Sequence, residues 1–120
     1  MSIVVGTALL ISTVVANTAT RVPEFNLDPT CRALESAAVG PGRTAENCRR
    51  SEFEARDQLK TRWSQFAVGD RERCVQVSTM GGMPSYVELI TCLEIAQDVA
   101  KLRERDRSST TGQSTTGQGR

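Results

Sequence analysis

The stretch "PSYVELITCLEIA" at residues 84–96 decides the fold of this chain. Ser85 followed three positions later by Glu88 is a capping-box pattern, in which both side chains bind free N–H groups at the start of a helix. Apolar side chains then recur at steps of three and four, as on one face of a helix: Tyr86, Leu89, Leu93, Ala96 and Ala100, with Ile90 beside them. Cys92 lies next to this stripe, and we expect it to point toward a neighbouring helix.

A second amphipathic helix is predicted from Thr44, a suitable N-cap, to about Ala67. One face is apolar and is expected to enter the core: Cys48, Ala55, Leu59, Trp63 and Phe66. The opposite face is charged and is predicted to be solvated: Arg49, Arg50, Glu52, Glu54, Arg56, Asp57, Lys60 and Arg62. A kink or restart is expected at Gly69, with Asp70 capping a further short helix.

Turn residues separate these elements. The segment "DPTCRALESAAVG" at 28–40 predicts a short helix with Asp28 as its N-cap, Pro29 in its first turn and Gly40 at its end. The "GPG" at 40–42 and the "TMGGMP" at 79–84 are expected to be breaks. The chain is therefore predicted to be all-α, a small bundle of three or four helices.

Both ends of the chain differ in composition from the middle. Residues 1–16 carry no charged side chain and resemble a signal peptide, the alternatives being an uncleaved anchor or a buried N-terminal helix. Residues 17–27 lack a helical period and are expected to be extended. Residues 107–120 contain "STTGQ" twice and no apolar side chain, which predicts a disordered tail. The folded domain is thus expected at 28–106, with no stable membrane span once the leader is removed.

The four cysteines are predicted to be structural. An exported chain meets an oxidising compartment, and a domain of this size commonly needs disulfides because its core is small. Helix-hairpin geometry favours Cys31 with Cys48 and Cys74 with Cys92, and the other two connectivities remain open. Each such bond, closing a loop of about 15 residues, can contribute about 3 kcal/mol.

Composition argues against several classes of function. The chain has no histidine and no C-x2-C pair, so we expect no metal site, no redox motif and no activated cysteine nucleophile. No cofactor-binding fingerprint is present. Fifteen basic and fourteen acidic side chains give a net charge of +1, which makes a nucleic-acid partner unexpected. We therefore predict a protein that is not an enzyme; a carboxylate enzyme with a groove between helix hairpins is the minority alternative.

One loop is a candidate interaction site. Loops carry binding functions more often than helix faces do, and methionines adapt to different partners. The candidate residues of this loop are Met80, Gly81, Gly82, Met83 and Tyr86. The alternative is a plain connector in which Met83 packs under the capping box.

Several features occur in a fixed order along about residues 30–105: the paired cysteines, the arginine-rich helix with Trp63, and the segments "DRERC", "TCLE" and "VAKLRER". In this order the chain resembles the N-terminal domain of LprI-type lysozyme inhibitors. The segment "PSYVELITCLE" also resembles small uncharacterised exported proteins of alpha-proteobacteria. The first resemblance implies an exported helical domain with paired cysteines. It carries no inhibitor contact residues to positions of this chain.

These observations predict a periplasmic or secreted, non-enzymatic binding module. Its partner would be a protein, for which a cell-wall hydrolase or another envelope protein is the leading candidate. The alternative is a small envelope structural or stress protein without a tight partner.

Overall fold

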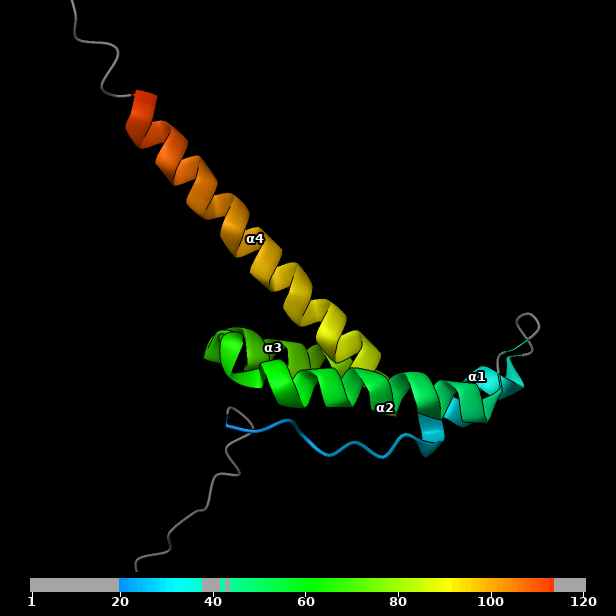
Figure 1. The fold of residues 1–120 in the computed structure, drawn as a ribbon. Coiled ribbons are helices and arrows are strands. Elements are labelled where there is room, and N and C mark those ends of the chain that lie inside the picture. Colours follow the sequence, from blue (N-terminus) through cyan, green and yellow to red (C-terminus); the bar gives the residue numbers. More distant parts are fainter. Residues whose placement is uncertain (1–19, 38–41, 43, 114–120) are drawn as a thin grey trace, which may run out of the picture.

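The computed structural model describes residues 20–37, 42 and 44–113, and within these the regular secondary structure is entirely helical, as predicted (Figure 1). No strand occurs in the described ranges. Two short 3-10 turns, η1 (Trp63–Gln65) and η2 (Met80–Gly82), separate longer helices. In chain order the α-helices are α1 (Asp28–Ser36), α2 (Ala45–Arg62), α3 (Val68–Thr79) and α4 (Tyr86–Gln113).

Thr44 is confirmed as a cap, whereas the caps predicted at Asp28 and Asp70 are wrong; Ala67 holds the N-cap position of α3, and Asp70 lies inside that helix. Thr44 caps α2 as expected, because its Oγ1 accepts a hydrogen bond of 3.1 Å from the backbone N–H of Asn47. Asp28 was predicted to cap α1 but is its first helical residue, and Leu27 holds the N-cap position. The Oδ1 of Asn26 accepts from the backbone N–H of Asp28 at 3.2 Å. A polar side chain two residues upstream thus takes the role assigned to Asp28.

The breaks between helices lie close to their predicted positions. Phe66 and Ala67 are extended and separate η1 from α3, so the restart comes just before Gly69, which is itself helical. The break at 79–84 is confirmed. Gly81 and Gly82 adopt φ values of 77° and 73°, in the left-handed region that residues with a Cβ seldom occupy. These two glycines allow the chain to reverse between α3 and α4.

The core lies where α2, α3 and the first turns of α4 meet. The predicted apolar face is buried at Ala55 and Leu59 of α2, at Trp63 of η1 and at Phe66 just after it. α4 contributes Tyr86, Leu89, Ile90 and Leu93. Residues 22–27 form an extended segment without regular secondary structure (Figure 1). They add the buried side chains of Val22 and Leu27 to the core. Packing on this side therefore uses residues outside the predicted helical domain.

Two disulfides tie the helices together in the favoured pairing. Cys31 of α1 bonds Cys48 of α2, and Cys74 of α3 bonds Cys92 of α4, with Cα–Cα distances of 5.5 and 5.6 Å. No cysteine is free, and all lie in the described ranges. Cys92 does point to a neighbouring helix, which answers why it sits beside the apolar stripe of α4.

The second half of α4 leaves the bundle and projects away from the other helices (Figure 1). Ala96 is half-buried and Ala100 is exposed, so the core-facing stripe ends at Leu93, earlier than the sequence predicts. The helix continues to Gln113, past the boundary at 107 where the tail was expected to start. Serine and threonine hydroxyls there donate to carbonyl groups one turn back, as Ser108 does to Glu104 at 3.0 Å.

Some predictions concern residues outside the described ranges. These are the signal peptide at 1–16, the start of the extended segment at 17–19, the helix end at Gly40 with the first part of the "GPG" break, and the last part of the tail, 114–120. Among the helices that the structure does describe, none has both the length and the apolar character required to cross a bilayer.

Candidate functional site

A groove of about 600 Å³ opens where α1, the first half of α2 and the start of α4 converge. Pockets that bind small molecules or anchor side chains commonly fall between about 300 and 1,000 Å³, so its size suits a ligand group. We call it the α1–α2–α4 groove. Its described lining residues are Thr30, Ala33, Leu34, Gly42, Thr44, Asn47, Cys48, Ser51, Glu52, Met80, Met83, Ser85, Val87 and Glu88.

The walls of the groove are exposed apolar side chains. Leu34 of α1 is 38% exposed, Met80 and Met83 of the loop are 73% and 47% exposed, and Val87 of α4 is 40% exposed. They come from three separate parts of the chain and meet at one surface. Large apolar side chains gathered around a concavity are typical of binding surfaces, whereas single ones scattered on a surface need no explanation.

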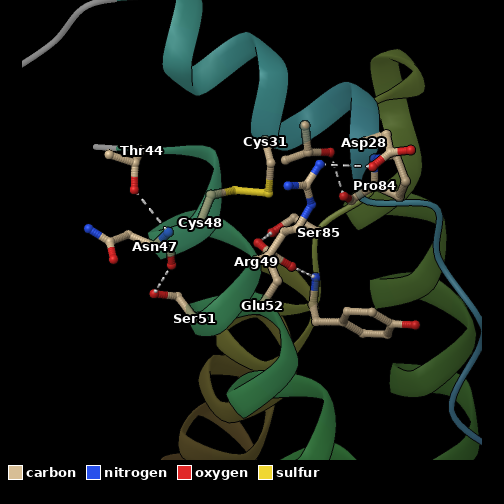
Figure 2. Close-up of a disulfide and its surroundings, with 12 residues drawn as sticks. Asp28, Cys31, Thr44, Asn47, Cys48, Arg49, Ser51, Glu52, Pro84 and Ser85 are labelled. Atoms are coloured by element: carbon tan, nitrogen blue, oxygen red, sulfur yellow. Dashed lines mark hydrogen bonds and ion pairs between the residues drawn. A yellow bond between two sulfur atoms is a disulfide. The ribbon is translucent and has the colours of Figure 1, made fainter. Parts of the chain in front are cut away.

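Covalent and polar links hold α1 at one side of the groove (Figure 2). The Cys31–Cys48 disulfide fastens α1 to α2. The Oγ1 of Thr30 donates to the carbonyl oxygen of Pro84 at 2.7 Å, which joins α1 to the loop before α4. An exposed ion pair between Asp28 and Arg49, 3.1 Å apart, adds a weaker link between α1 and α2. α1 is therefore held in place both by α2 and by the loop before α4.

Glu52 forms the inner end of the groove and caps α4 (Figure 2). Its side chain is buried, with the residue 4% exposed. One carboxylate oxygen accepts from the Oγ of Ser85 at 2.7 Å, and the other accepts from the backbone N–H of Tyr86 at 2.5 Å. A carboxylate at a helix N-terminus is favourable because the free N–H groups there carry partial positive charge.

The predicted capping box is only half present. The Oγ of Ser85 accepts from the backbone N–H of Glu88 at 3.1 Å, as expected. The backbone N–H of Ser85 was predicted to bind the Glu88 side chain, but it donates to the carbonyl of Ser78 at 3.2 Å. Glu88 is left exposed at the groove, and the carboxylate that caps α4 comes from Glu52, on a different helix.

Glu52 was predicted to lie on the solvated face of α2, and this prediction is wrong. On the predicted apolar face of that helix, Cys48 and Ala55 are seven residues apart, so one turn between them has no apolar residue. Glu52 occupies the missing position, four residues after Cys48 and three before Ala55. That gap in the period was the feature that could have identified it as an inward-facing carboxylate.

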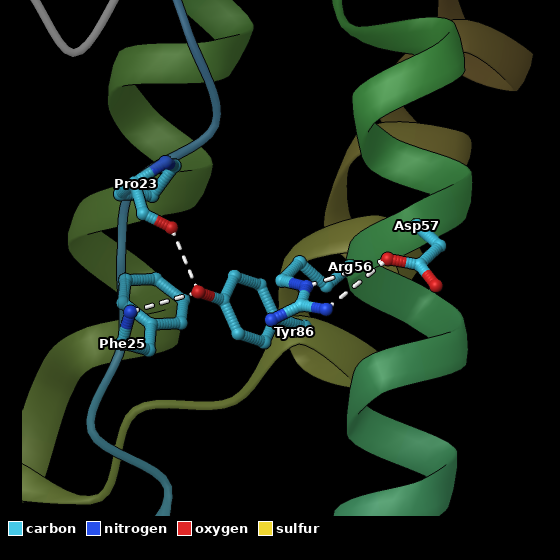
Figure 3. A network of polar contacts seen from close by, with 5 residues as sticks. All are labelled: Pro23, Phe25, Arg56, Asp57 and Tyr86. Atoms are coloured by element: carbon cyan, nitrogen blue, oxygen red, sulfur yellow. Dashed lines mark hydrogen bonds and ion pairs between the residues drawn. The ribbon is translucent and has the colours of Figure 1, made fainter.

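Tyr86 was grouped with the candidate interaction loop, but it belongs to the core and is 1% exposed. Its hydroxyl donates to the carbonyl of Pro23 at 2.9 Å and accepts from the backbone N–H of Phe25 at 2.8 Å (Figure 3). Its ring stacks on that of Phe25 at a centroid distance of 4.6 Å. Burial raises the pKa of the Tyr86 phenol above its ordinary value, while the hydrogen bond from Phe25 opposes the rise. Tyr86 thus fastens the N-terminal segment.

The remaining loop residues are accessible. Met80 and Met83 line the α1–α2–α4 groove, and Gly81 and Gly82 are exposed beside them. Met83 was alternatively predicted to pack under the capping box, yet nearly half of its surface faces solvent. The loop therefore contributes its two methionines to a surface that also includes Leu34 and Val87, which sequence reasoning missed.

The charged side chains among the described residues that line the groove are two carboxylates, Glu52 and Glu88. Glu52 is the one buried carboxylate in the described part of the chain, and both its oxygens are already hydrogen-bonded. The described residues contain no cluster of side chains suited to a metal ion. The groove therefore offers apolar contact area around a polar floor, whose carboxylate is already hydrogen-bonded. No protein-family model, curated protein or solved structure matches this chain, and the family resemblance stays a prediction.

Proposed function

We propose that this chain is an exported, non-enzymatic binding module, and that the α1–α2–α4 groove takes an apolar side chain of a protein partner. The observation that carries the proposal is the convergence of Leu34, Met80, Met83 and Val87 on one groove. In protein interfaces a few anchor side chains seated in such hollows provide most of the binding energy. Methionine walls suit this role because their unbranched side chains adjust to the shape of the anchor.

The framework supports binding in a different way. α1 is covalently fixed to α2, and the start of α4 is held by Glu52, so the walls keep their relative positions without a partner. A site that is already formed loses less conformational entropy on association than one that must be ordered. Export is supported by the pairing of all the cysteines, since disulfides persist in the periplasm or outside the cell.

The leading partner class is a cell-wall hydrolase, and lysozyme is the practical probe. Titration calorimetry of the oxidised chain with lysozyme should give saturable binding, and enzyme activity should fall in parallel. The variant Met83→Glu places a charge on the groove wall and should weaken the affinity at least about tenfold, which corresponds to about 1.4 kcal/mol.

Val77→Glu is the matched control because Val77 of α3 is equally exposed, at 48%, and is not among the described residues that line the groove. It should bind like the unchanged chain. No binding to lysozyme or related hydrolases would refute the hydrolase partner. Equal losses in the two variants would refute the groove as the binding site.

A further inference from the structure

α4 has two apolar faces, and the bundle covers only one of them. The inner face, with Leu89 and Leu93, is fully buried in the core. Ile95, Val99 and Leu102 form a second row, which we call the outer stripe, and they are 60%, 39% and 57% exposed. At 100° per residue this row lies on the side of the helix turned away from Leu93. A surface helix normally has a single apolar face.

The outer stripe begins where α4 passes α3 and ends at Leu102, in the half of α4 that projects from the bundle (Figure 1). Ile95 and Val99 also line a groove of about 460 Å³ between α3 and α4, together with Asp70, Arg73 and Arg103. An isolated helix shorter than about 15 residues is only marginally stable in water, because most helical stability in proteins comes from tertiary packing. A partner along the outer stripe would supply the packing that this segment lacks within one copy.

The spacing of the outer stripe is that of a coiled-coil seam. Ile95, Val99 and Leu102 follow steps of four and three, the d–a–d positions of a heptad repeat. The flanking positions carry charge, with Asp98 and Arg105 on one side of the seam and Arg103 on the other. Two copies of α4 can therefore complement each other, since Asp98 of one copy can face an arginine of its counterpart.

Charge also selects the orientation. The seam position after Leu102 is Asp106, and a parallel pair would set this carboxylate against its own copy. In an antiparallel pair Val99 faces Leu102 of the second copy, and Asp98 faces Arg105. Asp106 then lies opposite Ile95, beside Arg73, which lines the same α3–α4 groove. The antiparallel arrangement also keeps the two bundles at opposite ends.

We propose that a second copy of this chain docks on the outer stripe, so that the protein is an antiparallel dimer joined through α4. This contact is independent of the α1–α2–α4 groove, whose described lining residues contain none of the outer stripe. Each dimer would present two binding grooves, one in each bundle.

The test is sedimentation equilibrium of the full, oxidised chain over a range of concentrations. We expect twice the monomer mass for the unchanged protein, and a dissociation constant at least about tenfold higher for Val99→Asp. Val99 is exposed in the single copy, so the variant should keep its helical circular dichroism. Val77→Asp on α3 is the matched control and should dimerise normally. A monomer at millimolar concentration, or equal weakening by both variants, would overturn the proposal.

A charge exchange tests the orientation. Asp98→Arg alone should weaken the dimer, because it places two arginines opposite each other. Adding Arg105→Asp in the same chain should restore dimerisation, since the antiparallel pair again has opposite charges. Restoration by Arg103→Asp in its place would overturn the antiparallel arrangement, because that residue faces position 98 only in a parallel pair.

Discussion

Replacing Glu52 by glutamine tests whether a buried carboxylate from α2 fixes the start of α4. The substitution keeps the size and shape of the side chain and removes its charge. The amide oxygen can still accept from the backbone N–H of Tyr86. The amide nitrogen, however, is a donor and meets the hydroxyl of Ser85, which now donates to the carboxylate at 2.7 Å. That hydroxyl must then rotate to a poorer partner.

The magnitude follows from the two hydrogen bonds that Glu52 accepts. Hydrogen bonds to a charged group contribute about 1.5–3 kcal/mol, against about 0.5–1.5 kcal/mol for neutral pairs, so each loses about 1 kcal/mol. The attraction between the carboxylate and the N-terminus of α4 is also lost. A neutral amide is easier to bury than a charge, which offsets part of this. We expect Glu52→Gln to lower the free energy of unfolding by about 1–2 kcal/mol, and Glu52→Ala to lower it further by leaving the N–H of Tyr86 unbonded.

Urea denaturation followed by tryptophan fluorescence measures the loss, since Trp63 is the only tryptophan and is buried at 5% exposure. Amide hydrogen exchange gives a local readout, because the N–H of Tyr86 should exchange faster in Glu52→Ala. Glu54→Gln is the matched control: it is an exposed carboxylate on the same helix and should change stability by less than about 0.5 kcal/mol. A Glu52→Gln protein as stable as this control would refute the capping role.

Replacing both members of either disulfide by alanine, Cys31 with Cys48 or Cys74 with Cys92, should cost about 3 kcal/mol through the loop entropy of the unfolded chain, measured by urea denaturation under oxidising conditions. Loss of under about 1 kcal/mol for both pairs would contradict their role as the main staples. Because the folded pKa of Tyr86 is raised, the stability it contributes is complete below its ordinary pKa of 10.0 and is lost as pH rises through the folded value. Stability should therefore fall above about pH 10 in the unchanged chain and fall less in Tyr86→Phe, with tyrosinate absorbance reporting this one phenol; parallel curves would contradict the assignment.

The sequence predicts the helices well because their causes are local. Caps, glycine breaks and apolar periods act over a few residues, and the apolar faces of α2 and α4 were identified from spacing alone. Helix-hairpin geometry favoured the observed disulfide pairing but left the two other connectivities open. The start of the tail was predicted at 107 because no apolar side chain occurs from there to residue 120. The helix of α4 continues to Gln113, and serine and threonine hydroxyls in its last turns donate to carbonyl groups one turn back.

The candidate site was predicted only in part because its causes are not local. Met80 and Met83 were identified as loop residues, yet Leu34 and Val87 join them only after α1 and α4 are packed. Tyr86 was assigned to both the loop and the helix stripe, and only the packing of Phe25 against it decides for the core. A single sequence shows which side chains are apolar. Whether each of them is buried depends on residues that are distant in sequence and meet it only in the folded chain.

The polar contacts of Glu52 explain why a chain with so small a core can keep an open groove. An apolar residue at this position would draw the walls together, because burying more apolar surface is favourable. A carboxylate that is held by Ser85 and by the start of α4 fixes the inner end of the groove without closing it. The Cys31–Cys48 bond does the same at the outer wall. Glu52 and the disulfide thus stabilise the fold while Leu34, Met80, Met83 and Val87 stay accessible, as the proposed binding function requires.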